Sequence, residues 1–264
     1  MAWAFSISAS LSGRSSTSNK ASGRSREIPN VCKTQNEMPL KLQEPLIYLI
    51  TSGQATAATT PDSKEFTEVL RLVEAAARSQ FSLLQLREKR LTARVLYELT
   101  VQAAEILRNS STRLLVNDRA DIAMAVGADG VHLTSSSIET AVVRQTFGKD
   151  FLIGVSTHSL ADARTARDEQ ASFAVFGPVF ATASKQVYGD PVGLGGLREA
   201  VSAVTPFPLL ALGGVTLDNV EECFRGGAAG IAAIRLFQDP SKLAAVVARI
   251  REIFAEIDED GPGH

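Results

Sequence analysis

The sequence predicts a single (β/α)8 TIM barrel, preceded by an N-terminal extension that we expect to be disordered. From Pro45 onward, eight short apolar runs alternate with amphipathic segments, which is the pattern of strand–helix units. The units recur every ~20–40 residues, and 264 residues is a normal length for such a barrel. An open doubly wound sheet would need fewer strands and a point at which the strand order reverses. We therefore expect a closed parallel barrel.

We expect three segments along the chain: a leader over residues 1–40, the barrel over 45–257 and a tail over 258–264. The first thirty residues are rich in Ser and contain four basic residues but only one acid, Glu27. That composition is typical of an organelle transit peptide and equally of a disordered tail. A third interpretation is that translation begins at Met38, just before the first predicted strand. The sequence leaves these three interpretations open.

The composition argues against a membrane protein and against a general nucleic-acid binder. Hydrophobic residues make up 45% of the chain and charged residues 21%, and apolar runs such as 207–212 are too short to cross a bilayer. The formal net charge of −2 gives no general attraction to nucleic acid or membranes, so any phosphate affinity must come from a local arrangement. Cys32 and Cys223 lie in dissimilar contexts, which argues against a disulfide framework and for a reducing compartment. We expect a cytoplasmic protein that binds small molecules, with homo-oligomerisation left open.

Each predicted strand is a short apolar run, and each predicted helix carries an apolar face, as Phe66, Val69 and Val73 do in the first. The strands are predicted at residues 46–50, 82–86, 114–116, 130–133, 151–155, 173–176, 209–212 and 229–234. The helices are predicted at 64–78, from a Thr92 N-cap to about 107, at 120–126 ending on Gly127, around 142–143, at 160–168, at 198–204, from a cap at Thr216 or Asp218 to 224, and at 241–257. An unusually long loop, 177–196, follows the sixth strand.

Polar residues collect where the second strand ends. Gln85, Arg87 and Lys89 alternate with apolar or acidic neighbours, so an extended strand would place all three on one side. If that side is the barrel interior, one amide and two cations form an anion cradle at the carboxyl end, where barrels carry their active sites. The alternative is a solvated strand end whose cations pair with Glu88.

The third and fourth strands also end in polar residues. Asn117 and Asp118 form either a turn and helix cap or, if Asp118 lies beside the cations, a place for Mg2+ held against a pyrophosphate. His132 is either a packed, hydrogen-bonded core residue or a ligand. The sequence does not separate these interpretations.

The later strand ends offer hydroxyls and flexible backbone. Ser156 is suited to donate to a phosphate oxygen and His158 to transfer protons near neutral pH, unless Ser159 caps the next helix and His158 lies at the surface. The loop after the sixth strand, which contains Thr182, Ser184 and Lys185, suits a mobile lid that closes on phosphate. Two glycines, 213–214, let backbone approach a ligand closely at the usual barrel phosphate site.

These segments resemble the thiamine-phosphate synthase/TenI superfamily, from Tyr48 to the last helix. The stretches that carry the resemblance are Gln85-Leu86-Arg87-Glu88-Lys89, Val116-Asn117-Asp118-Arg119, Gly130-Val131-His132-Leu133, Gly154-Val155-Ser156-Thr157-His158, Gly177-Pro178-Val179-Phe180 through Lys185, and Leu212-Gly213-Gly214-Val215. The resemblance implies a synthase that joins hydroxymethylpyrimidine diphosphate to hydroxyethylthiazole phosphate, giving thiamine phosphate and pyrophosphate.

The resemblance also implies roles for individual residues. Gln85 would contact the pyrimidine and Asp118 would bind Mg2+. The diphosphate would be held by Arg87, Lys89, Asn117, Ser156 and Lys185, of which Arg87, Lys89 and Lys185 would assist catalysis by stabilising the leaving group. The thiazole phosphate would be held by Thr182, Ser184 and the backbone of Gly214.

Two positions depart from the pattern that synthases usually show. Ser137 stands where a second Mg2+-binding Asp is usual, and Arg235 stands where a small Ser usually contacts phosphate. The segment 186–195 is also closer to the TenI-like branch, whose thiazole tautomerases use a histidine that matches His158. We therefore expect a synthase, with a TenI-like tautomerase or a non-catalytic regulator that binds a thiamine precursor as alternatives.

Overall fold

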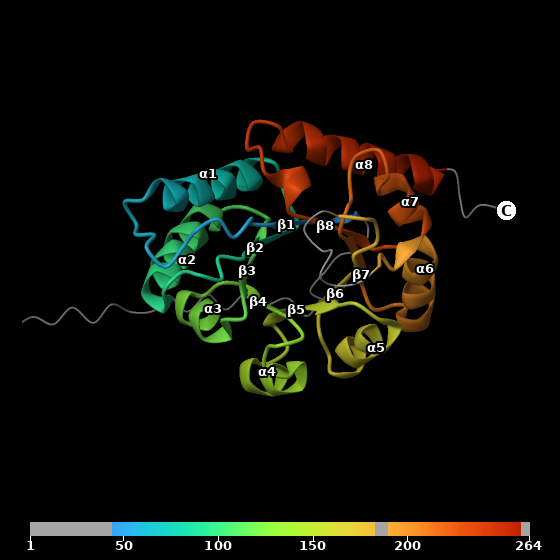
Figure 1. Ribbon diagram of the computed structural model, residues 1–264, viewed down its shortest axis with the longest axis horizontal. Helices are drawn as coiled ribbons and strands as arrows, with labels where there is room; N and C mark the ends of the chain where they lie inside the picture. Colours follow the sequence, from blue (N-terminus) through green and yellow to red (C-terminus); the bar gives the residue numbers. More distant parts are fainter. Residues whose placement is uncertain (1–43, 183–189, 260–264) are drawn as a thin grey trace, which may run out of the picture. The chain divides into compact units, whose positions relative to one another are not determined.

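Eight parallel strands close into a barrel, and helices surround it (Figure 1). The computed structural model describes residues 44–182 and 190–259, and closure comes from the pairing of β1 with both β2 and β8. The strands are β1 (Leu46–Ile50), β2 (Leu83–Leu86), β3 (Arg113–Asn117), β4 (Gly130–Leu133), β5 (Leu152–Thr157), β6 (Phe173–Phe176), β7 (Leu209–Leu212) and β8 (Gly230–Ala233). The helices are α1 (Lys64–Arg78), α2 (Ala93–Leu107), α3 (Ala120–Val126), α4 (Thr140–Phe147), α5 (Leu160–Asp168), α6 (Gly193–Val204), α7 (Val220–Arg225) and α8 (Leu243–Glu259), with the 3-10 helix η1 (Arg235–Phe237) after β8. The predicted (β/α)8 barrel is confirmed.

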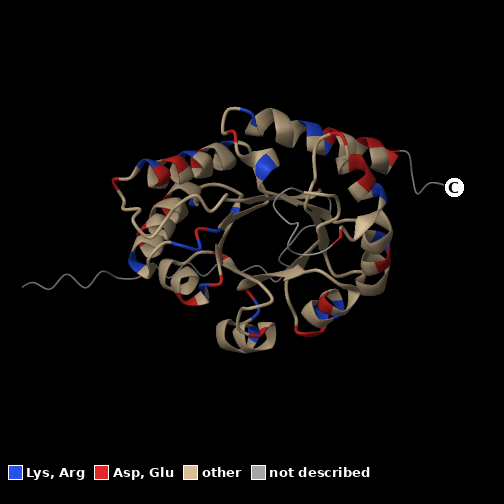
Figure 2. Cartoon of the chain, viewed as in Figure 1, with Lys and Arg blue, Asp and Glu red and all other residues tan. Residues whose placement is uncertain are grey.

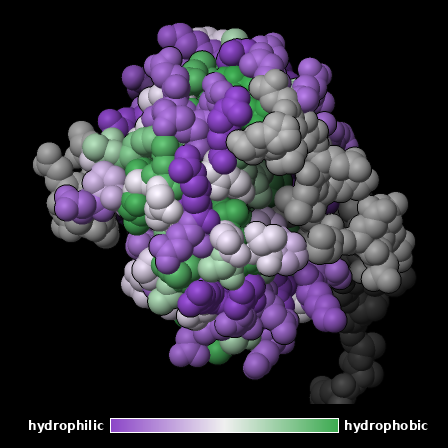
Figure 3. All heavy atoms as spheres, turned by 90° about the vertical axis from the view of Figure 1, so that its right-hand side faces the viewer, coloured by the Kyte–Doolittle hydropathy of each residue, from purple (hydrophilic) through white to green (hydrophobic). Residues whose placement is uncertain are grey.

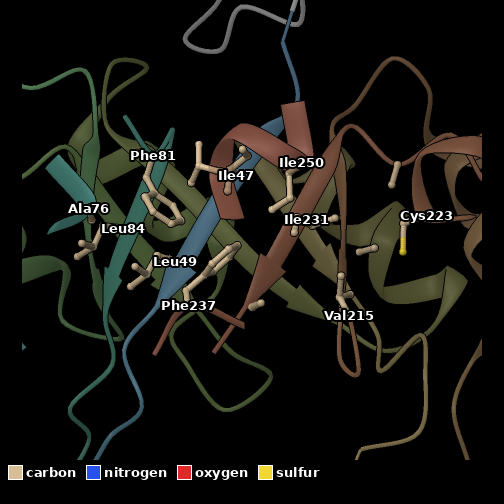
Figure 4. Close-up of a cluster of buried hydrophobic side chains, with 14 of the residues drawn as sticks. Ile47, Leu49, Ala76, Phe81, Leu84, Val215, Cys223, Ile231, Phe237 and Ile250 are labelled. Atoms are coloured by element: carbon tan, nitrogen blue, oxygen red, sulfur yellow. The ribbon is translucent and has the colours of Figure 1, made fainter. Parts of the chain in front are cut away.

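The strand side chains alternate between two hydrophobic layers. In β1, Ile47 and Leu49 pack outward into a large cluster that includes helix residues, whereas Tyr48 packs inward among residues of the other strands. Figure 4 shows part of the outer cluster, in which the rings of Phe81 and Phe237 meet edge to face at 4.9 Å. Burial of this layer attaches the helices to the barrel.

Aromatic rings fill the barrel interior, and a strand glycine makes room for them. The centroid of the Tyr48 ring lies 5.4 Å from that of Phe173 and 5.6 Å from that of His132. A Cβ at Gly154 would lie 2.5 Å from the Phe173 ring and 2.6 Å from His132 Nδ1. The interior is therefore a packed core, and a ligand has access only at an end of the barrel.

The helix α6 begins earlier than the sequence predicts. We expected a loop over 177–196 and a helix from residue 198, but α6 begins at Gly193. Glycine occupies three of its first four positions, which disfavours a helix by propensity. Leu194 and Leu197 nevertheless pack against the outer cluster, and this burial outweighs the low propensity.

Two predicted helix caps are confirmed and one prediction is wrong. The side chains of Thr92 and Ser159 cap α2 and α5, the latter as a full capping box. Neither Thr216 nor Asp218 caps α7, whose N-cap is Asn219. The Oδ1 atom of Asn219 accepts a hydrogen bond from the Thr216 backbone N–H at 2.8 Å, and the resulting turn delays the start of the helix.

Charged residues lie mostly on the helices and loops (Figure 2). Within the eight strands described, Arg113 is the only Lys, Arg, Asp or Glu. The face carrying α6 and α7 is covered by interspersed hydrophilic and hydrophobic side chains (Figure 3). Across residues 44–182 and 190–259, no helix combines the length and the apolar character needed to cross a bilayer. Charge near the barrel interior therefore comes from the loops that follow the strands.

We predict that Gly230→Ala lowers the free energy of unfolding by about 3 kcal/mol, because the new side chain must displace backbone. A Cβ at this position would lie 2.1 Å from the carbonyl oxygen of Leu46 in the paired strand β1. Gly195→Ala is the control, since its Cβ would meet no atom within 4 Å, and it should stabilise α6 by up to ~1 kcal/mol. Urea denaturation of both variants checks this, and similar unfolding free energies would contradict it.

Candidate active site

The strand β2 ends at Leu86, directly before Arg87 and three residues before Lys89. Gln85 is buried and lies two residues after Leu83, which packs inside the barrel. The two side chains are therefore on the same, interior side of the strand. Arg87 is half-buried and Lys89 is exposed, and both lie in the loop that follows. The predicted end of this strand at residue 86 is confirmed, but the alternation that would place Gln85, Arg87 and Lys89 on one side of an extended strand is wrong; the cations still follow the carboxyl end of β2.

Backbone contacts hold Arg87 at the barrel rim. Its N–H donates to Thr51 Oγ1 at 2.8 Å, which ties the loop after β2 to the loop after β1. Gly53 has a φ of 74°, and a Cβ there would lie 3.3 Å from Arg87 Nη1, so glycine lets this loop approach the guanidinium. Neither Arg87 nor Lys89 forms an ion pair with any of the residues described. Two cations at one strand end without an acidic partner in the described part of the chain suit an anion.

Glu88 has a structural role that the sequence analysis missed. Its carboxylate is buried and accepts hydrogen bonds from the Thr51 hydroxyl at 2.7 Å and from the backbone N–H groups of Gly53 and Ala55 at 3.1 Å each. The alternative in which Glu88 neutralises the neighbouring cations is therefore wrong. In the sequence Glu88 stands between two cations, which suggested that it pairs with them. Its actual partners lie in another loop, so no local sequence pattern could reveal them.

Two buried amide groups at the strand ends have polar atoms without a partner among residues 44–182 and 190–259. They are Nε2 of Gln85 and Oδ1 of Asn117, on the neighbouring strands β2 and β3. Leaving a buried donor or acceptor unpaired costs about 1–3 kcal/mol. Such atoms on adjacent strands near the barrel rim suit a polar ligand that would complete their hydrogen bonding.

Asp118 lies beside the Asn117 amide and does not cap a helix. Its backbone is left-handed, with a φ of 57°, and its Oδ2 accepts a hydrogen bond from Asn117 Nδ2 at 2.6 Å. The N-cap of α3 is Arg119, which makes no side-chain capping bond, so the helix-cap interpretation is wrong. The left-handed turn instead keeps the carboxylate next to the Asn117 amide.

Hydroxyl groups complete the surroundings of Asp118. Ser137 donates a hydrogen bond to Asp118 Oδ1, and Thr134 lies 3.4 Å from the same oxygen. The set is made of oxygen atoms, which suits a hard cation such as Mg2+. In the part of the chain that the structure describes, no three His, Cys, Asp or Glu side chains converge as a metal site. A cation here would therefore need ligand oxygens from a bound substrate or from water.

His132 is a buried, hydrogen-bonded core residue on β4. Its Nδ1 lies 3.1 Å from the Tyr48 hydroxyl and its Nε2 3.0 Å from Ser156 Oγ. Burial lowers the pKa of His132 to about 3; the negative charge of Asp118 opposes this shift, and the positive charges of Lys89 and Arg87 add to it. His132 is therefore neutral at physiological pH. These influences also place the three charged groups around the same end of the barrel.

His158 follows β5 and is half-buried. Its Nδ1 lies 2.5 Å from the carbonyl oxygen of Gly177, which only accepts hydrogen bonds, so Nδ1 carries the proton. Its backbone N–H donates to Asp162, the residue that completes the Ser159 capping box of α5. The imidazole of His158 thus bridges the ends of β5 and β6, which fixes the orientation of its ring. The helix cap by Ser159 is present as well.

The loops after β6, β7 and β8 meet at the far side of the rim. Phe180 N–H donates to the carbonyl oxygen of Gly213 at 3.0 Å, and a Cβ at Gly214 would lie 2.7 Å from Phe180 Cβ. Arg235, at the start of η1, donates a hydrogen bond to the Thr182 hydroxyl. This arrangement joins backbone, a hydroxyl and a guanidinium, as a phosphate site requires. The predicted residues Ser184 and Lys185 lie outside the described ranges.

Known proteins are similar to this chain along most of the barrel. The profile of the thiamine monophosphate synthase family, TMP-TENI, matches residues 47–237. The chain belongs to this family. Every described residue of the strand-end site lies within the matched segment.

Three members illustrate the similarity of this chain to the thiamine monophosphate synthase family. A thiamine-phosphate synthase of Moorella thermoacetica is 38% identical over 70% of this chain and 87% of its own length. One of Methanoculleus marisnigri is 36% identical over 78% of this chain and 96% of its own length. The structure of thiamine phosphate pyrophosphorylase from Pyrococcus furiosus superposes with a TM-score of 0.65 at 28% identity, covering 82% of this chain and 98% of that one.

We predict that Glu88→Ala destabilises the fold by about 3 kcal/mol, because it removes one buried acceptor and leaves three donors unpaired. Glu88→Gln keeps one acceptor oxygen and should cost less. Glu98→Ala on α2, where the partly exposed carboxylate pairs with exposed Arg94, is the control and should change stability by less than ~0.5 kcal/mol. Chemical denaturation gives the three values, and equal values for Glu88→Ala and Glu98→Ala would contradict the role of Glu88.

We predict that His132 makes stability fall with acidification. Its pKa is about 3 in the folded chain and 6.5 without the fold, so between these values the unfolded chain binds a proton that the folded chain does not. The stabilisation is complete above about pH 6.5 and is lost below it, by up to ~1.4 kcal/mol per pH unit. Urea denaturation between about pH 7 and pH 5 should show a shallower pH dependence for His132→Gln. Identical slopes for the variant and the wild type would exclude this contribution.

Proposed function

We propose that this chain is a thiamine-phosphate synthase, which joins hydroxymethylpyrimidine diphosphate to hydroxyethylthiazole phosphate and releases pyrophosphate. The observation that carries the proposal is the strand-end cluster. It combines the unpaired cations Arg87 and Lys89 with the unpartnered amide atoms of Gln85 and Asn117. A diphosphate needs cations and hydrogen-bond donors, and a pyrimidine ring needs an amide. Relatives named as synthases support the same assignment.

The reaction needs charge stabilisation more than proton transfer. The bond between the pyrimidine methylene carbon and the diphosphate oxygen breaks, and its electron pair leaves with the pyrophosphate. The thiazole nitrogen then donates its lone pair to the carbon, and no proton is removed in either step. Arg87, Lys89 and Ser156 would stabilise the departing charge, and Gln85 would orient the pyrimidine. His132 fits this scheme, because its low pKa makes it a poor base.

Mg2+ fits the oxygen set around Asp118 if the substrate supplies further oxygens. Asp118 would hold the ion. The hydroxyl of Ser137, which donates a hydrogen bond to the Asp118 carboxylate, lies next to this position. When bound, the ion would supply positive charge to the diphosphate. A site with one carboxylate should bind Mg2+ weakly without substrate and more tightly with it.

The second substrate would bind through its phosphate at the loops after β6 to β8. The Gly214 backbone and the Thr182 hydroxyl lie there, and Arg235 already contacts Thr182. Arg235 would add a guanidinium to the phosphate site. We keep the predicted phosphate contact of Ser184 and the diphosphate contact of Lys185 as proposals.

A thiazole tautomerase is the second candidate, and one observation favours it. Because Nδ1 of His158 donates to Gly177, the basic lone pair of the neutral ring lies on Nε2, as a proton-transfer residue requires. A tautomerase, however, has no pyrophosphate to hold, and the cations after β2 would then have no partner. The synthase therefore accounts for more of the site.

We predict that Arg87→Ala and Asp118→Ala each lower thiamine-phosphate formation by at least ~100-fold, since each removes charge that acts on the leaving group or its cation. The assay mixes purified protein, both substrates and Mg2+ and detects thiamine phosphate. Exposed Arg90→Ala, in the same loop, is the matched control and should keep full activity. His158→Ala should retain synthase activity.

Synthase activity that survives both the Arg87→Ala and the Asp118→Ala substitution would contradict the assignment. A wild-type protein that forms no thiamine phosphate but interconverts the thiazole carboxylate tautomers, and loses this activity in His158→Ala, would establish the tautomerase instead.

A further inference from the structure

Three side chains form a hydrogen-bonded line from the barrel core to the rim. Tyr48 on β1 is fully buried, His132 on β4 is 2% exposed, and Ser156 on β5 is half-buried. The Tyr48 hydroxyl lies 3.1 Å from His132 Nδ1, and Ser156 Oγ lies 3.0 Å from His132 Nε2. The line joins the packed interior to a residue of the proposed diphosphate site.

The buried end of this line fixes the direction of every hydrogen bond in it. Among the residues described, His132 Nδ1 is the only hydrogen-bond partner of the Tyr48 hydroxyl. A buried O–H with one partner donates to it, because otherwise its hydrogen would be left unpaired. Nδ1 therefore accepts and carries no proton. The ring proton then lies on Nε2, which donates to Ser156 Oγ.

This direction decides what Ser156 presents to a ligand. A serine hydroxyl has one hydrogen to donate and lone pairs to accept with. Since Ser156 accepts from His132, its own hydrogen stays available for an anion at the rim. With the opposite direction, Ser156 would donate to His132 and turn its lone pairs toward the anion, which repels them.

Packing holds the histidine ring in this orientation. The Phe173 ring lies 6.2 Å from the His132 ring and meets Tyr48 edge to face. A Cβ at Gly154 would lie 2.6 Å from His132 Nδ1, so the backbone of β5 lies directly against that nitrogen. A ring flip would move both nitrogens away from their partners within a filled core.

We infer that Tyr48 and His132 are positioning residues that direct the hydroxyl hydrogen of Ser156 toward the diphosphate. The direction follows from the buried contacts alone, and its use for a diphosphate rests on the proposed function. Neither Tyr48 nor His132 needs to touch the substrate for this role.

The first test is the tautomer of His132 in the wild-type protein, measured by two-dimensional nitrogen–proton NMR of the histidine rings. The inference predicts the Nε2–H form. Finding the proton on Nδ1 would overturn it. The measurement uses the wild-type protein, so it does not depend on the folding of a variant.

The second test measures the affinity for inorganic pyrophosphate in the presence of Mg2+. Tyr48→Phe keeps the ring and removes the donor, so it should weaken binding about fivefold to tenfold and let the Nδ1–H form appear. Ser156→Ala should weaken binding to a similar degree, and Tyr48→Phe should have no further effect in that background. Leu210→Val, a change in the same interior cluster, should leave both the tautomer and the affinity unchanged.

An unchanged pyrophosphate affinity in Tyr48→Phe, or additive effects of the two substitutions, would overturn the inference. These binding and NMR results can be distinguished from a failure of the proposed function, because the proposed function is tested by turnover of the wild-type protein. An Nε2–H tautomer and coupled losses of pyrophosphate affinity support the positioning role whether or not thiamine phosphate is formed.

Discussion

The pairing of β8 with β1 is the contact on which the site depends. Leu46 to Leu49 align with Gly230 to Ala233, and this closes the sheet. In a closed parallel barrel the carboxyl ends of all strands lie on one rim. Residues far apart in the sequence, such as Gln85 and Ser156, are thereby held at the same end by strands that bury almost no charge. The ring-filled interior then leaves the rim as the place where a ligand binds.

The polar groups of the rim divide into those with a structural partner and those without one among the residues described. Glu88 is fully occupied by three hydrogen bonds that hold the loop after β1. Because this carboxylate is used there, Arg87 and Lys89 are left without an acidic partner among the residues described. The amides of Gln85 and Asn117 likewise keep buried atoms without partners. In a stable fold such groups are costly, and a diphosphate and a pyrimidine would supply what they lack.

The sequence alone predicted the barrel, nearly every element and the residues of the rim, because apolar periodicity and strand-end polarity are local signals. It failed where the deciding contact is distant. The glycine-rich start of α6 is helical because Leu194 and Leu197 are buried against other elements. Glu88 looked like a partner of its sequence neighbours, yet it binds another loop. The direction of the Tyr48–His132–Ser156 line also required side chains of β1, β4 and β5 to meet inside the closed barrel.

The central claim is that the rim holds a diphosphate with its cation at Asp118. A crystal structure of the protein with pyrophosphate and Mg2+ tests it most directly. We predict pyrophosphate in contact with Arg87, Lys89 and the Ser156 hydroxyl, and Mg2+ bound to Asp118 and to pyrophosphate oxygens. Pyrophosphate bound away from the ends of β2, β3 and β5, or Asp118 without a metal while pyrophosphate occupies the rim, would contradict it.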